Sequence, residues 1–316
     1  MAAAKENVVI QAGDYIVTLM PEFGGKIASI SVAGTELLQT PLHPYAPRTQ
    51  NTPFDAGDAS GWDECLPSVG ACSVNTPFGP ASVPDHGDLW RLPWEVLAAS
   101  ADSATLRVRC FSLPLELTRT VLLTPVPGGA KLQLLYSLTN TSDYTVPWSW
   151  SAHPLFTALP GDRVVLPASV QTLRLEGSGN NRLGLNGDSV SWPIAHEANG
   201  ERDISLAQDA STGIGDKLFA GPLSEGDGWC ILERPNVGLR ITIRFESAIT
   251  PYLGLWLCYG GWPGGDGLKQ VCVAPEPCTA PVDSLAETGP WSRQLTPGET
   301  CTWPMEVEIV TIPAEA

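Results

Sequence analysis

Apolar and polar residues alternate with a period of two in several short segments of this chain. Successive side chains of a strand point to opposite faces, so this period predicts strands that are buried on one face. We expect half-buried strands over residues 15–20, 26–32, 105–111, 115–123, 131–138 and 239–245. Segments rich in β-branched, aromatic or leucine residues predict further strands over 144–150, 229–232, 252–258, 270–274 and 300–309.

The connection between residues 115–123 and 131–138 predicts the clearest hairpin. It ends in Gly128-Gly129, and glycine readily adopts the positive φ that a chain reversal usually requires. Helical periodicity is nearly absent: only 281–287, and less clearly 203–208, could form a short helix, and neither is long enough for an α/β crossover. The pattern therefore predicts an all-β fold, a large antiparallel β-sandwich with very little helix.

The net charge of the chain limits the classes of partner that it is expected to bind. The chain has 34 Asp plus Glu against 18 Lys plus Arg, a formal net charge of −16. A field of this sign repels polyanions and anionic lipid surfaces, so we expect no nucleic-acid partner and no membrane partner. A phosphorylated or sulfonated small molecule stays open, because two neighbouring arginines can bind one anion inside an acidic protein.

The first residues and the cysteines bear on the compartment. Residues 1–7 lack the apolar core of a signal peptide, and no apolar run reaches the roughly 18 residues that span a bilayer, so we expect a cytoplasmic protein. The eight Cys show no zinc-ribbon spacing. In a reducing compartment we expect them to be small buried hydrophobes rather than disulfides or catalytic thiols, and we expect no metal or other cofactor.

Two of the four histidines stand in local sequences that favour chemistry. His86 lies in the polar segment 84–88, and His153 is held in extended backbone because Pro154 follows it. An imidazole can donate a proton near neutral pH and take it back, since its reference pKa is about 6.5. The alternatives are a turn histidine bonded to a neighbouring aspartate for His86 and a core histidine for His153.

Three acidic residues are candidates for a general base. Glu276 stands between Pro275 and Pro277, which fix its backbone, and a carboxylate held this rigidly suits a base. A solvated charge at a strand end is the alternative. Asp63 or Glu64 could join Glu276 in a two-carboxylate glycosidase or lyase, but neighbours on a strand face opposite ways, so only one of them can share its cleft. Hydrogen bonding or a turn is their other role.

Aromatic residues add a possible binding surface. The chain has eleven Trp, and aromatic faces suit the apolar side of a sugar ring. Trp62, Trp90, Trp256 and Trp262 lie near the polar candidates or in Gly-rich segments. Because most tryptophans of a sandwich belong to its core, we expect one or two of them to form a binding platform.

Four short motifs occur in an order that resembles the aldose 1-epimerase (galactose mutarotase-like) family. They are Phe23-Gly24-Gly25-Lys26-Ile27, Asp85-His86-Gly87, Ala152-His153-Pro154-Leu155-Phe156 and Pro275-Glu276-Pro277. The likeness covers nearly the whole chain. It implies a single galactose mutarotase-like β-sandwich domain over residues 1–316, with the site on its concave face.

The resemblance also implies a role for each candidate. His153 would protonate the sugar ring oxygen, Glu276 would take the proton from the anomeric hydroxyl, and His86 would hydrogen-bond the ring-oxygen side. Asp216, in Gly215-Asp216-Lys217-Leu218-Phe219, resembles the family's Asp that holds sugar hydroxyls. The remaining candidates for substrate contact are Arg48, for the arginine that the family carries before its first histidine, and Trp62, Asp63 and Glu64.

What the resemblance predicts is a cytoplasmic isomerase of carbohydrate metabolism that binds a small-molecule sugar without a cofactor, as a monomer or homodimer. A free hexose is favoured, because the Arg-Gly-Gly motif of hexose-6-phosphate mutarotases does not occur in this sequence. A hexose-phosphate mutarotase, a carbohydrate-binding sandwich without catalysis, and the two-carboxylate glycosidase or lyase stay open as alternatives.

Overall fold

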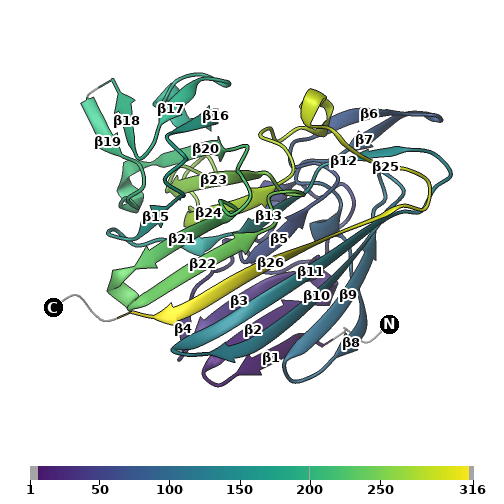
Figure 1. The fold of residues 1–316 in the computed structure, drawn as a ribbon, viewed down its shortest axis with the longest axis horizontal. Helices are drawn as coiled ribbons and strands as arrows, with labels where there is room; N and C mark the ends of the chain where they lie inside the picture. The colour runs from purple at the N-terminus through teal and green to yellow at the C-terminus, as the bar shows by residue number, and fades with distance from the viewer. Residues whose placement is uncertain (1–5, 199, 313–316) are drawn as a thin grey trace.

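Two large sheets make up most of the structure, a computed structural model that describes residues 6–198 and 200–312. Residues 1–5, on which the signal-peptide expectation largely depends, lie outside this range. The first sheet has 12 strands in the order β1-β2-β3-β5-β13-β24-β23-β20-β16-β17, with β4 paired to β3 and β14 to β24 (Figure 1). Its strands are β1 (Val8–Ala12), β2 (Tyr15–Met20), β3 (Lys26–Val32), β4 (Thr35–Glu36), β5 (Trp62–Cys65), β13 (Ser151–Pro154), β14 (Phe156–Thr157), β16 (Thr172–Ser178), β17 (Ser189–Ser191), β20 (Ile214–Ala220), β23 (Tyr252–Tyr259) and β24 (Val271–Cys278).

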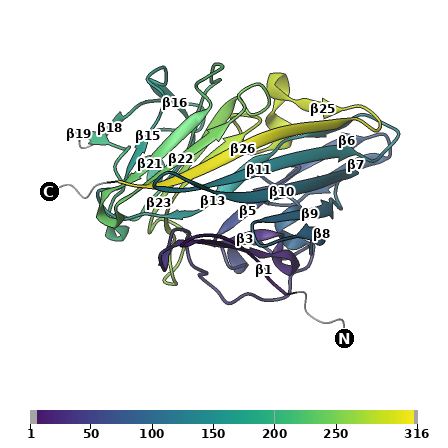
Figure 2. The ribbon, with the colours of Figure 1, turned by 60° about the horizontal axis from the view of Figure 1, so that its bottom comes forward.

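The second sheet has eight strands in the order β15-β21-β22-β26-β11-β10-β9-β8. They are β8 (Glu95–Ala99), β9 (Ser103–Arg109), β10 (Leu115–Val126), β11 (Gly129–Asn140), β15 (Arg163–Val165), β21 (Trp229–Arg234), β22 (Leu239–Phe245) and β26 (Thr300–Thr311). Three small pairs complete the strands: β6 (Cys72–Thr76) with β7 (Gly79–Val83), β12 (Val146–Trp148) with β25 (Arg293–Leu295), and β18 (Ile194–Glu197) with β19 (Gly200–Asp203). Figure 2 shows the β6–β7 and β18–β19 pairs at opposite ends of the molecule.

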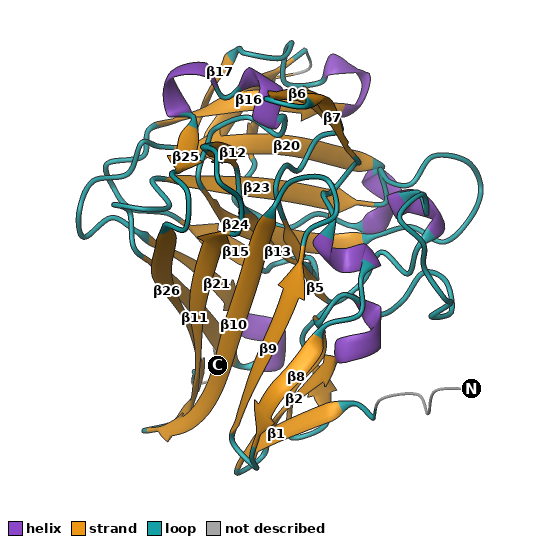
Figure 3. Ribbon diagram, turned by 90° about the vertical axis from the view of Figure 1, so that its right-hand side faces the viewer, coloured by secondary structure: helices purple, strands orange, loops and turns teal. Residues whose placement is uncertain are grey.

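Helix is confined to short 3-10 turns in the connections (Figure 3). No helix of the described residues has the length and apolarity needed to cross a membrane. The turns are η1 (Pro21–Phe23), η2 (Phe54–Ala56), η3 (Leu89–Arg91), η4 (Gly179–Asn181), η5 (Ala210–Thr212), η6 (Pro235–Val237), η7 (Leu285–Glu287) and η8 (Gly289–Trp291).

The predicted all-β class and the predicted strands are confirmed. The segments 15–20, 26–32 and 239–245 coincide with β2, β3 and β22, and the other predicted strands are found with their ends moved by a few residues. The predicted hairpin is also confirmed, because β10 and β11 pair antiparallel up to Val126 and Gly129, across Pro127-Gly128.

The two short helices predicted from the sequence fare differently. Within 281–287, only the 3-10 turn η7 is helical. The prediction for 203–208 is wrong, because Asp203 ends β19 and its side chain accepts hydrogen bonds from the backbone and hydroxyl of Ser205. Ser205 in turn accepts a backbone hydrogen bond from Val164 of β15, which holds the segment extended.

Alternation of side chains builds the core between the two sheets. In β10, the buried residues Leu115, Leu117, Val121 and Leu123 alternate with partly exposed ones. The same period places Tyr136 of β11 and Trp303 of β26 in register on the buried face, with their rings stacked 5.3 Å apart. Residues of both sheets form one continuous apolar cluster, as expected for a sandwich.

Strands β23 and β24 are buried on both faces. Leu255 and Leu257 of β23 and Val273 of β24 belong to the core between the sheets. The intervening Trp256 and Ala274 belong to a separate apolar cluster on the other face. This second surface, which we call the outer face, carries the candidate site.

Candidate active site

A cavity of about 160 Å³ lies on the outer face of β23 and β24. His86, His153 and Glu276 all line it, although they are separated by up to 190 positions in the sequence. Phe54, Trp256 and Trp262 supply aromatic walls. A cleft that combines apolar walls with a few convergent polar groups is typical of a small-molecule site.

Glu276 is fully buried, and its two carboxylate oxygens have different surroundings. Oε2 accepts hydrogen bonds from the Lys217 ammonium and, at 3.4 Å, from the Ser151 hydroxyl. Oε1 has no hydrogen-bond partner among the described residues and lies 3.9 Å from Nε2 of His153. Burial raises the pKa of Glu276 above its ordinary value, while Lys217 acts in the opposite direction to a smaller extent.

His153 occupies β13, where it pairs with Asp63 of β5. It is only 5% exposed, and its Nδ1 has no hydrogen-bond partner among the residues that the structure describes. Burial lowers the pKa of His153 well below its ordinary value, and the nearby His86 and Lys217 act in the same direction. Both effects weaken the hold of the imidazole on a proton, so a proton on it is readily given up.

His86 approaches the cavity from a turn rather than from a strand. Its φ is +57°, and its Nδ1 lies 3.0 Å from the carboxylate of Asp85. The ring stacks on Phe54 with centroids 3.6 Å apart, and it meets the His153 ring edge to face at 5.2 Å. These contacts hold the two imidazole rings next to each other in the lining of the cavity.

Gly87 allows the chain to turn beside His86, and we expect Gly87→Ala to destabilise the fold by about 2–3 kcal/mol. Its φ is +66°, and an added Cβ would meet the backbone of Leu66. Urea denaturation followed by Trp fluorescence measures the effect. Gly13→Ala is the matched control: its φ is +60° with no atom within 4 Å, so about 1 kcal/mol is expected. Equal losses in both variants would contradict the steric argument.

Asp216, the predicted hydroxyl-binding residue, does not line the cavity. In β20 it pairs with Leu257, whose side chain points into the core between the sheets. Its buried carboxylate accepts a 2.6 Å hydrogen bond from Ser178 and forms an ion pair with Arg182. Side chains alternate along a strand, so the next residue, Lys217, is the one that reaches the cavity.

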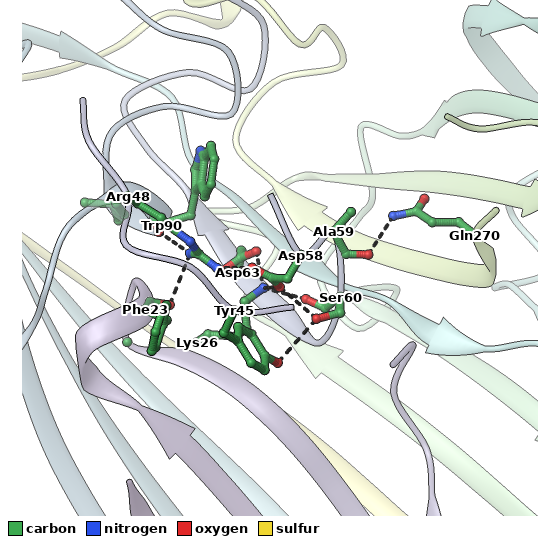
Figure 4. A network of polar contacts seen from close by, with 12 residues as sticks. Phe23, Lys26, Tyr45, Arg48, Asp58, Ala59, Ser60, Asp63, Trp90 and Gln270 are labelled. Carbon is green, nitrogen blue, oxygen red and sulfur yellow. Dashed lines mark hydrogen bonds and ion pairs between the residues drawn. The ribbon is translucent and has the colours of Figure 1, made fainter. Parts of the chain in front are cut away.

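Arg48 and Asp63 lie in a buried ionic network beside the cavity rather than in its lining (Figure 4). Arg48 pairs with Asp58 and donates to the carbonyl of Trp90. Lys26 lies between two carboxylates, 2.5 Å from Asp63 and 3.0 Å from Asp58. The network fixes the loop that precedes β5, which is the loop that carries Phe54.

Trp62 and Glu64 are also absent from the lining. Both are fully buried, and Glu64 lies on the face of β5 turned toward the second sheet. There its carboxylate accepts hydrogen bonds from Arg119 at 2.9 Å and from Tyr136 at 2.9 Å. Asp63 and Glu64 thus point to opposite sides of the strand, as predicted, and neither reaches the cavity that contains Glu276.

Several lining residues were not predicted as site residues from the sequence: Phe54, Lys217, Gln270 and Asp283. Lys217 had a signal, because it directly follows Asp216 in the motif Gly215-Asp216-Lys217-Leu218-Phe219 that the resemblance had marked. Gln270 supports the aromatic wall, since it accepts a 3.0 Å hydrogen bond from Trp256 and donates one of 3.1 Å to the carbonyl of Ala59. Phe54 lies in a loop with no periodic pattern that could have pointed to it.

Metal-binding side chains do not gather anywhere in the described part of the chain, where no group of three or more His, Cys, Asp or Glu could hold an ion. Each of the eight cysteines is free. Five of them are buried, Cys65, Cys230, Cys258, Cys272 and Cys278. The polar side chains of the cavity lining are two imidazoles, an ammonium, an amide and carboxylates.

Comparison with known proteins identifies the fold. No protein-family model matches this sequence, and no curated protein sequence matches it. The Slr1438 protein from Synechocystis sp. PCC 6803 is 16% identical with a TM-score of 0.71, over 98% of this chain and 99% of that chain. A galactose mutarotase-like protein from Lactobacillus casei ATCC 334 is 17% identical with a TM-score of 0.67, over 96% and 100%. The GalM/aldose epimerase homologue from C. elegans is 12% identical with a TM-score of 0.66, over 98% and 99%.

These likenesses extend over the whole sandwich, and the chain has a galactose mutarotase-like fold. The resemblance inferred from the order of four sequence motifs is thus confirmed at the level of the fold. Identities of 12–17% carry the fold and not the activity.

Proposed function

We propose that this protein is an aldose 1-epimerase that interconverts the α and β anomers of a hexose or a related sugar. The observation that supports the proposal is the convergence of His86, His153 and Glu276 on one cavity with aromatic walls. Mutarotation requires an acid and a base that act on two neighbouring oxygens of the sugar. Nε2 of His153 and Oε1 of Glu276, 3.9 Å apart, face the same space and can serve as that pair.

The proposed reaction is a proton relay in two directions. Oε1 of Glu276 takes the proton of the anomeric hydroxyl while the imidazolium of His153 gives a proton to the ring oxygen. The bond between the anomeric carbon and the ring oxygen breaks, and the anomeric carbon becomes an aldehyde. After rotation about the adjacent carbon–carbon bond, the same two residues reverse their roles and the ring closes on the other face of the carbonyl.

The electrostatics of the cavity suit this exchange. Burial raises the pKa of Glu276 and lowers that of His153, so the two groups approach each other in proton affinity. The relay needs one proton on this pair, on His153 before the ring opens and on Glu276 afterwards. The rate should therefore fall at low pH, where both groups are protonated, and at high pH, where neither is.

The lining favours an uncharged sugar. Lys217 is its only lysine or arginine among the described residues, and it is paired with Glu276. Asp85 and Asp283 add negative charge to the wall. A phosphate would meet these carboxylates without a free cation to bind it, so the free sugar is preferred over its phosphate ester.

The two-carboxylate alternative has weaker support. Inverting and retaining glycosidases need a second carboxyl on the opposite side of the scissile bond. The two candidates for that role, Asp63 and Glu64, are held by Lys26 and Arg119 outside the cavity. A sandwich that binds sugar without turnover is the second candidate function, because Trp256 and Trp262 would form the same platform in either case.

The test is anomer exchange measured by NMR on a panel of free aldoses and hexose phosphates. We expect exchange faster than in buffer for at least one free sugar, with no change of mass. Saturable binding by calorimetry without faster exchange would support the binding sandwich instead. Products of changed mass from a glycoside panel would support hydrolysis or elimination.

A further inference from the structure

Only one of the two carboxylate oxygens of Glu276, the base of the proposed reaction, is bound by hydrogen-bond donors of the described residues. Oε2 of Glu276 is engaged by Lys217 and Ser151, whereas Oε1 is without a hydrogen-bond partner among the described residues and is directed at His153. Lys217 itself is only 9% exposed, so its contact with the carboxylate is shielded from water. Nothing in the family resemblance predicted a cation at this place.

We propose that Lys217 is a positioning residue whose ammonium holds Oε2 of Glu276 and leaves Oε1 as the one oxygen that can take the proton of the sugar. The inference rests on the proposed function, which it extends by assigning a residue that controls the base. Lys217 acts through Glu276 in this scheme. It takes no proton from the sugar itself.

The strand order shows that this contact is built into the sheet. Lys217 lies on β20 and Glu276 on β24, with β23 between them. The residue of β23 that pairs with Glu276 is Gly254. A Cβ at Gly254 would lie 3.2 Å from Cβ and 3.4 Å from Oε2 of Glu276. The absence of a side chain there leaves room for the lysine to reach across the middle strand.

The surroundings of the ammonium indicate that it keeps its charge. Asp283 approaches it to 3.8 Å from the connection after β24, and the Phe219 ring centroid lies 5.3 Å away. Burial disfavours the charged form, but attraction by Glu276 and Asp283 outweighs burial and raises the pKa of Lys217. The charged form of the ammonium is thus favoured beside the base.

This cation has a consequence for the pH range of the base. A buried carboxylate tends to bind a proton, and a cation in contact opposes that tendency. The other titratable groups around Glu276 are His153 on β13, His86 in its turn, Asp283 after β24, and the thiols of Cys65 and Cys278, whose pKa values burial raises. Asp283 repels a negative Glu276, and the thiols are uncharged. Lys217 is therefore the cation in direct contact that favours the ionised form of Glu276, which is the form that can accept a proton.

The experiment compares Lys217→Met with Lys217→Arg in the full chain. We expect the acid limb of the pH–rate profile to move to higher pH in Lys217→Met and to stay near the wild-type position in Lys217→Arg. A shift of one pKa unit corresponds to a roughly tenfold loss of rate on that limb. Lys131→Met is the matched control, because it removes a lysine that pairs with Glu306 on the second sheet, and it should leave the limb in place. A Lys217→Met profile with an unmoved limb would overturn the inference.

A direct titration separates this inference from the proposed function. ¹³C NMR of glutamate-labelled protein, with the Glu276 signal assigned by its loss in Glu276→Gln, reports the carboxylate whether or not any sugar is turned over. We expect the Glu276 carboxylate to titrate at higher pH in Lys217→Met than in the wild type and in Lys217→Arg. If Lys217→Met fails to fold, Lys217→Gln takes its place, and a Glu276 titration that does not move in it would overturn the inference. If no sugar exchanges faster than in buffer, the proposed function fails and this measurement still decides the role of Lys217.

Discussion

Glu276→Gln is expected to slow anomer exchange by about 10²–10⁴-fold, the usual contribution of a general base. The amide is close in shape to the carboxylate, but it cannot take a proton from the anomeric hydroxyl. Lys217 would also lose its anionic partner, although Asp283 remains 3.8 Å from its ammonium. Line-shape or exchange NMR on the best sugar of the panel measures the effect, at a pH where the wild type is fastest.

Two further variants test whether the loss of rate is specific to the acid–base pair. His153→Asn should cause a loss of similar size, because the acid and the base act in the same step. Glu116→Gln, in an ion pair with the exposed Arg109 on the second sheet, should leave the rate unchanged. A Glu276→Gln variant that keeps the wild-type rate while folding normally would show that Glu276 is not the base.

Arg119→Met is expected to have the largest effect on stability, a loss of about 3–5 kcal/mol in the free energy of unfolding. Arg119 and Glu64 are both 0% exposed and form an ion pair of 2.9 Å between the two sheets. Methionine keeps most of the volume of the arginine side chain but leaves the carboxylate of Glu64 buried without its cation. Urea denaturation followed by far-UV circular dichroism gives the difference.

The loss should depend on pH in a defined direction. Burial raises the pKa of Glu64 to about 7, despite the opposing effect of Arg119. Since this pKa lies above that of the unfolded chain, the folded state holds the proton more tightly. The contribution of Glu64 to the free energy of unfolding is therefore greatest at low pH. It decreases as the pH rises toward 7 and does not change further above that pH. In Arg119→Met the pKa of Glu64 rises further, so the variant keeps losing stability above pH 7 and the gap to wild type widens.

Two controls distinguish a buried charge from general damage to the core. Glu64→Gln combined with Arg119→Met should recover much of the lost stability, because no charge is then left unpaired. Arg109→Met removes a pair whose arginine is 75% exposed, and surface pairs contribute about 0–1 kcal/mol. A loss in Arg119→Met that is equal at low and high pH would contradict the role of Glu64.

The all-β class could be predicted from the sequence because several long strands of the sandwich carry a period-two pattern, whereas shorter strands such as β1, β5 and β20 were not predicted. The segment 115–123 alternates as it does because every second side chain of β10 enters the core. The helix predicted over 203–208 was wrong for a physical reason. The backbone N–H of Ser205 donates a hydrogen bond to the Asp203 carboxylate, and the Ser205 carbonyl accepts one from Val164 of β15. The second is a long-range contact that a local sequence pattern cannot predict.

The candidate site was predicted in part. His86, His153 and Glu276 were found because unusual residues flank them and their order matches a known family. Asp216 was not found at the cavity, since one position of strand register decides whether it or Lys217 faces outward. That register is fixed by the pairing of β20 with β23, where Trp256 lies opposite Lys217. The sequence of β20 alone does not determine this register.

The two buried faces of β24 imply that protein stability and chemistry are encoded at alternate positions of one short segment. Val273 packs into the core between the sheets, and Glu276 belongs to the opposite face with the cavity. A saturation mutagenesis scan of this strand, scored once for abundance and once for turnover, should give two interleaved profiles. Under the proposed function, variation at one set of positions alters the preferred sugar while the other set preserves the scaffold, so that the two properties are free to diverge independently in evolution.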